Sequence, residues 1–170
     1  MNCEEIRNQF RPKVARLLLI GESPPANGTF FYNADSRLFC HTVAAFAKAG
    51  LLTGDAVVFL DAFRDLGCFL DDLCHLPVNH LPKRMRQAAR NSSAPELASR
   101  LRGLRPALVV CVMRGIVPAV SRAMELARMQ ETKFHSVPFP AQGRQQQYVK
   151  QLAEIVSRTN LSLTVECTTS

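Results

Sequence analysis

Short apolar runs separated by polar loops predict a chain in which strands alternate with helices. One apolar run ends at Gly21 and another follows Pro106, and both are typical of buried parallel strands. The predicted strands lie at 14–20, 56–60, 107–112 and 134–137. Helical spacing of apolar residues predicts helices at 36–48, 93–104, 116–129 and 145–156. Prolines and polar residues between 62 and 82 indicate a structured loop with at most one short helix.

This alternation indicates an α/β fold, specifically a three-layer α/β/α sandwich around a mostly parallel, four-stranded central sheet. We expect one domain over residues 1–160, followed at 161–170 by a C-terminal tail or an edge strand. Ligands of such sheets bind beyond the carboxyl ends of the strands. That rule selects the segments 21–33, 61–65, 113–115 and 138–144.

Length and composition favour an intracellular globular domain. The chain has 170 residues, of which 47% are apolar, so it is long enough to bury a core as a single domain. No apolar run approaches the roughly 20 residues that span a bilayer. The first residues are polar and acidic, unlike a secretory signal, which predicts a cytoplasmic location without membrane association.

The cysteines and histidines predict neither a disulfide framework nor a metal site. Six cysteines fall at irregular intervals. The spacing of Cys68, Cys74, His75 and His80 matches no common zinc-binding pattern. We therefore expect no cofactor and no metal cluster.

The charge balance raises the expectation of a polyanionic partner. Lys and Arg number 21 against 14 Asp and Glu, a formal net charge of +7. Basic residues that include Arg84 crowd the segment 83–105, where Glu96 alone opposes them. This segment is either a solvated helical face or a patch that faces phosphates.

The loop after the first strand has the residues of a binding pocket. Glu22 follows the strand directly, two prolines stiffen the backbone, and the aromatic residues Phe30, Phe31 and Tyr32 come next. This order supplies an ionisable group, a rigid turn and a flat apolar wall. As an alternative, the phenylalanines belong to the core and Glu22 caps the next helix.

Gly21-Glu22-Ser23-Pro24 resembles the first motif of the uracil-DNA glycosylase superfamily, in the branches where the motif begins Gly-Glu-x-Pro. The resemblance implies that an aromatic ring, Phe30 or Phe31, stacks on a base flipped out of the DNA. It also places Ser23 and Asn33 of this loop among the base-binding residues. A polar residue at the end of the next strand would read the base edge, and Asp61 holds that position after the predicted strand 56–60.

A second stretch is similar to the His-Pro-Ser-Pro motif of the same superfamily. Here it reads Val137-Pro138-Phe139-Pro140, so that a valine stands in the place of the histidine. The resemblance implies that Pro138, Phe139 and Pro140 contact DNA. Phe139 would act as a wedge in the gap left by the flipped base, or else as a buried loop residue. Arg144 and Arg84 would contact phosphates.

Together these features predict a DNA glycosylase that hydrolyses the N-glycosidic bond of uracil or a related damaged base in single- or double-stranded DNA. In this hypothesis Glu22 stabilises the positive charge that develops on the sugar, and Asp61 is its catalytic partner. A protein of the same fold that binds nucleic acid or a nucleotide without cleavage is the main alternative, because the motif histidine is absent. A serine esterase with Ser23 as nucleophile is a further alternative, but it lacks the expected Asp-x-x-His pair at His135. The sequence does not define the base removed or the oligomeric state.

Overall fold

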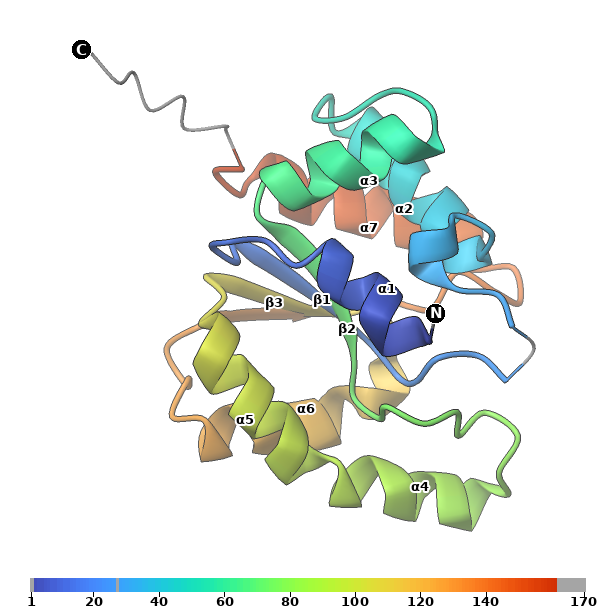
Figure 1. Cartoon of the computed structure of the whole chain (residues 1–170), viewed down its shortest axis with the longest axis vertical. Helices are drawn as coiled ribbons and strands as arrows, with labels where there is room; N and C mark the ends of the chain where they lie inside the picture. The colour runs from blue at the N-terminus through green and yellow to red at the C-terminus, as the bar shows by residue number, and fades with distance from the viewer. Residues whose placement is uncertain (1, 27, 162–170) are drawn as a thin grey trace.

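The part of the chain that the computed structural model describes, residues 2–26 and 28–161, contains a sheet of four parallel strands in the order β2-β1-β3-β4 (Figure 1). The strands are β1 (Leu17–Gly21), β2 (Cys68–Asp72), β3 (Leu108–Cys111) and β4 (Lys133–Ser136). Helices cover both faces, which confirms the predicted three-layer α/β/α sandwich. The predicted tail or edge strand lies outside the described residues from 162 onward.

The helices form a layer on each side of the sheet. Helices α2, α3 and α7 lie on one side, and α5 and α6 lie on the other, with α4 leading into α5 (Figure 1). Helix α1 lies beside β2 at the edge of the sheet. Their bounds are α1 Cys3–Gln9, α2 Arg37–Lys48, α3 Ala56–Asp65, α4 Lys83–Ser92, α5 Ala94–Leu104, α6 Val117–Leu126 and α7 Gln145–Ser157, with short 3₁₀ turns η1 Phe31–Asn33 and η2 Arg114–Ile116.

The segments 14–20, 107–112 and 134–137, predicted as strands, overlap with β1, β3 and β4. Every side chain of β1 and β3 is buried, because helices cover both faces of these central strands. Strand β4 lies at the edge and alternates between exposed and half-buried positions. The predicted helix at 36–48 is also confirmed: the Ser36 side chain accepts the Phe39 N–H at its start, and Gly50 with φ +70° follows its end.

The predicted strand at 56–60 is wrong, because these residues begin helix α3. The Asp55 side chain accepts the Val58 N–H and caps the helix. Phe59 and Phe63, four residues apart, are both buried, whereas Val58 is exposed, which is helical and not alternating burial. The second strand is instead Cys68–Asp72, within the segment predicted as a loop. A five-residue apolar run is compatible with a strand or with a helix. Here the Asp55 cap and the burial of Phe59 and Phe63 on one face favour the helix.

One tyrosine side chain forms hydrogen bonds with the backbone of β2, a strand at the edge of the sheet. The Tyr32 hydroxyl accepts the N–H of Leu70 at 2.7 Å and donates to the carbonyl of the same residue at 2.9 Å. The ring of Phe10 stacks on Tyr32 with centroids 5.1 Å apart. Through these contacts Tyr32, in the loop after β1, binds β2 directly, and Phe10 of the N-terminal segment packs on Tyr32.

Replacement of Gly67 by alanine should destabilise the turn between α3 and β2. Gly67 has φ +78°, and an added Cβ would lie 2.7 Å from the carbonyl oxygen of Val14. We expect Gly67→Ala to lower the free energy of unfolding by about 1–3 kcal/mol in urea denaturation. Gly103→Ala is the matched control, since Gly103 lies in α5 with its nearest neighbouring atom 3.8 Å from the added Cβ, and should stabilise by up to about 1 kcal/mol. Equal effects of the two substitutions would contradict this interpretation.

Candidate functional site

A cavity of about 520 Å³ opens at the carboxyl ends of β1 and β2, a volume typical of small-molecule sites. Three of the four segments selected from the sequence contribute to its wall: the loop after β1, the residues after β3 and the loop after β4. Residues of the cavity wall that carry the argument below are Gly21, Glu22, Ser23, Phe30, Phe31, Asp72, Arg86 and Phe139. A cavity is therefore present at the carboxyl edge of the sheet, where the sequence predicts the site.

Glu22 lies at the cavity with both carboxylate oxygens bound by arginines of α4. Oε1 accepts the Nε hydrogens of Arg86 and Arg90, each at 2.6 Å, and Oε2 pairs with Arg86 Nη2. Burial by itself would raise the pKa of Glu22, but hydrogen bonds and charges from the two arginines lower it below its ordinary value. The side chain is thus an ionised carboxylate that attaches α4 to the end of β1. It does not cap a helix: α2, the next α-helix, is capped by Ser36.

Asp72 is the last residue of β2 and is paired in register with Gly21 of β1. Its Oδ2 accepts Arg7 Nη2 at 2.6 Å, and within residues 2–26 and 28–161 its Oδ1 has no hydrogen-bond partner. Burial raises the pKa of Asp72 to about 7; Asp71 adds to the shift, whereas Arg7 and Arg100 oppose it. A Cβ at Gly21 would clash with Oδ1, so the glycine leaves room for this oxygen. Asp72 therefore contributes to the cavity wall a carboxyl group whose pKa is near neutral, and Arg7 holds only its Oδ2.

Asp61, expected to be catalytic, lies away from the cavity. It belongs to α3, its side chain is 52% exposed, and it forms an ion pair with Arg64 at 3.1 Å. Asp61 was expected to bind the base edge because it followed the predicted second strand. In the structure the second strand is β2, and the residue at its end is Asp72. The run Cys68–Asp72 after Gly67 was the signal that could have found it, because a glycine turn and a short apolar run precede the acids.

The two expected stacking residues belong to the cavity and to the core at once. Phe30 and Phe31 line the cavity but are only 2% and 3% exposed. The ring of Phe31 packs edge-on against Phe39 at 5.5 Å, whereas Phe30 meets Tyr32 edge-on at 5.6 Å. The two rings thus form a rigid apolar wall. Asn33, also expected to bind the base, is exposed at the end of η1 and is not part of the cavity wall.

Ser23 lines the cavity, but no histidine that could activate it as a nucleophile lies among the described lining residues. Its Oγ accepts the N–H of Val78 at 3.2 Å. His135 lies instead beside a separate hollow between β4 and α7. This arrangement offers Ser23 no general base, which disfavours the esterase alternative.

The loop after β4 reaches the cavity through one residue. Phe139 is half-buried and lines it, whereas Pro138 and Pro140 are buried. Val137, in the place of the motif histidine, is fully buried, and its N–H donates to Cys111 at 2.9 Å.

The two basic residues expected to contact DNA both lie on the surface. Arg144 is exposed immediately before α7, and Arg84 is exposed beside a hollow along α4. Their positions leave both guanidinium groups accessible to phosphates.

Neither the described side chains nor the comparisons with known proteins point to a metal, a membrane span or a relative. Within the described part of the chain, no group of three or more His, Cys, Asp or Glu side chains is placed to hold a metal ion. No described helix has the length and apolar character needed to cross a membrane. No protein-family model matches the chain, and no curated protein matches it.

Asp72→Asn should remove a pH dependence from stability. Because the pKa of Asp72 is raised from 3.8 to about 7 on folding, the native state keeps a proton that the unfolded chain releases between these values. The contribution of Asp72 to the free energy of unfolding is therefore most favourable below pH 4, falls as the pH rises to 7, and stays low above that. Relative to Asp72→Asn, the wild type should lose stability as the pH rises from about 4 to about 7, and the difference between the two proteins should then stay constant, as measured by urea denaturation. A difference between the two proteins that is constant with pH would contradict the raised pKa.

Arg90→Met should destabilise the protein through Glu22. The substitution leaves this buried carboxylate with one arginine instead of two, and we expect a loss of about 2–3 kcal/mol in thermal or urea unfolding. Arg84→Met removes the same charge from the exposed side of α4 and should change stability by no more than about 0.5 kcal/mol. Similar losses in both variants would show that Arg90 does not stabilise the site.

Proposed function

We propose that the protein is a DNA base-excision glycosylase that hydrolyses the N-glycosidic bond of uracil or a related damaged base. The observation that carries this proposal is the cavity whose wall contains Asp72, Phe30 and Phe31 together. A flipped base needs an apolar wall against its face and a hydrogen-bonding group at its edge. The cavity supplies both, at the edge of the sheet where ligands of parallel α/β proteins bind.

Asp72 is suited to the recognition of a base edge. An ionised carboxylate only accepts hydrogen bonds, whereas a protonated one also donates. With a pKa of about 7, Asp72 changes between these two forms near neutral pH. In this proposal Oδ1 reads the base, while Arg7 holds Oδ2.

Cleavage of the C1′–N bond builds positive charge on the sugar and negative charge on the departing base. A solvent water then adds to C1′ and releases a proton, and the base takes up a proton as it leaves. The ionised carboxylate of Glu22 stabilises the sugar cation in this proposal. Val137 provides no side-chain donor to the base, since it is apolar and buried. Arg86, which lines the same cavity, is the cation positioned to stabilise the anion.

The second candidate is a protein that binds nucleic acid or a nucleotide without cleaving it. One observation favours it specifically: Arg86 and Arg90 bind both oxygens of Glu22, which competes with any water that this carboxylate would orient. The recognition of the base by Asp72 and the phenylalanines would be the same in both candidates.

Incubation with uracil-containing single- and double-stranded DNA, followed by alkaline cleavage of abasic sites, tests the proposal. The wild type should produce strand breaks, and the rate should fall at least about tenfold in Glu22→Gln, while Asp72→Asn should change the rate or the base preference. Asp61→Asn is the matched control: the same substitution on an exposed residue of α3 should leave the rate unchanged.

The other outcomes separate the alternatives. DNA binding without product from any uracil-containing substrate would contradict the glycosylase and favour the non-catalytic candidate. Ester hydrolysis that disappears in Ser23→Ala would contradict both and favour the esterase.

A further inference from the structure

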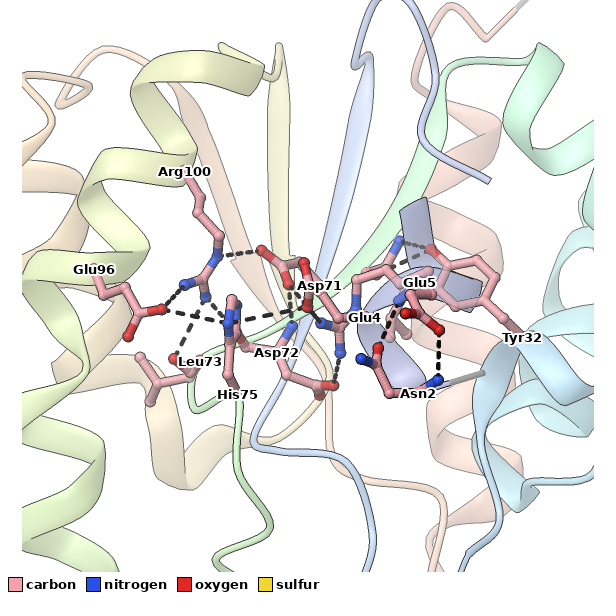
Figure 2. A network of polar contacts seen from close by, with 12 residues as sticks. Asn2, Glu4, Glu5, Tyr32, Asp71, Asp72, Leu73, His75, Glu96 and Arg100 are labelled. Carbon is pink, nitrogen blue, oxygen red and sulfur yellow. Dashed lines mark hydrogen bonds and ion pairs between the residues drawn. The ribbon is translucent and has the colours of Figure 1, made fainter. Parts of the chain in front are cut away.

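A chain of charged contacts links the first helix to the cavity wall. Figure 2 shows Asp71 and Asp72 between Arg100 of α5 on one side and Glu4 of α1 on the other. Arg100 donates from Nε to Asp71 Oδ2 at 2.7 Å and from Nη2 to the Asp72 carbonyl at 2.6 Å. Arg100 of α5 thus binds the backbone at the end of β2, whereas the carboxyl group of Asp72 is bound by a residue of α1.

Arg7 of α1 makes that contact to the carboxyl group. Its side chain is 3% exposed, Nη2 lies 2.6 Å from Asp72 Oδ2, and Nη1 lies 2.8 Å from Glu4 Oε2. The guanidinium carbon also lies over the ring of Phe30, 5.6 Å from its centroid, at the distance of a cation–π contact. One buried side chain therefore contacts both the polar and the apolar group of the proposed base-binding site.

We propose that Arg7 is a positioning residue of this site, which holds Asp72 Oδ2 and supports the Phe30 ring so that Asp72 Oδ1 stays free and correctly aimed at the base. The proposal rests on the proposed function and adds a residue from outside the cavity wall. Arg7 is held in place by the structure of α1, where a capping box between Asn2 and Glu5 fixes the first turn.

The contact with Arg7 also lowers the pKa of Asp72, against the larger effect of burial, which raises it. Removal of a cation 2.6 Å away raises the pKa of a carboxyl group, typically by about one unit or more. Besides Arg7, the charged or titratable groups that interact electrostatically with Asp72 are Tyr32, Asp71, Cys74 and Arg100, and Glu4 faces Arg7 from the same helix.

The test follows the Asp72 carboxyl carbon by NMR across pH 5–9. In Arg7→Met the midpoint should rise by about one unit or more, and Arg7→Lys, which keeps the charge, should restore most of the difference. Arg11→Met is the control for loss of one charge from the same N-terminal segment and should leave the midpoint unchanged. An unchanged midpoint in Arg7→Met would overturn the proposal.

Binding of free uracil and cleavage of uracil-containing DNA provide the second readout. Arg7→Met should lose at least about tenfold in uracil binding or in DNA cleavage. The double variant Arg7→Met/Asp72→Asn should lose less than the product of the two single losses, because Arg7 acts in part through Asp72. Additive losses would overturn the proposal. The double variant also removes both buried charges, so it remains measurable if Arg7→Met fails to fold.

The two readouts keep the proposals apart. If the wild type neither binds uracil nor cleaves DNA, the proposed function fails, and the NMR midpoints still decide whether Arg7 controls Asp72.

Discussion

The ends of β1 and β2 depend on pairing between buried carboxylates and arginines. Glu22, Asp71 and Asp72 all lie out of water at the carboxyl edge of the sheet, where an unpaired charge would cost several kcal/mol. Three different helices supply the cations: α1, α4 and α5. These ion pairs offset the cost of burying the carboxylates, and they also join the helices to the sheet where the cavity opens. Stability and the geometry of the site therefore depend on the same interactions.

This pairing gives the two acids opposite properties. Glu22 receives two arginines and keeps its charge, whereas Asp72 receives one, lies beside Asp71, and has a pKa raised to about 7. An ionised and a readily protonated carboxyl group at one cavity are the combination that acid–base and electrostatic catalysis use. The proposed glycosylase chemistry assigns the first to the sugar and the second to the base.

Local pattern was enough to predict most of the fold but not the charged contacts. Continuous apolar runs identified β1 and β3, and the loop after β1 indicated Glu22 and Phe30. The second strand was misplaced because a five-residue apolar run fits a helix equally well, and Asp72 was missed with it. Arg7 gave no signal, because its partner lies 65 residues away in the sequence and α1 is short and polar.

The most direct test is a structure of the protein bound to an oligonucleotide that contains a non-hydrolysable 2′-deoxyuridine analogue. The expected result is the base inside the cavity, with its edge within hydrogen-bond distance of Asp72 Oδ1 and its face against the wall that contains Phe30. A base bound elsewhere, or DNA held on the surface with the base still stacked in the strand, would contradict the assignment of this cavity to an extruded nucleobase.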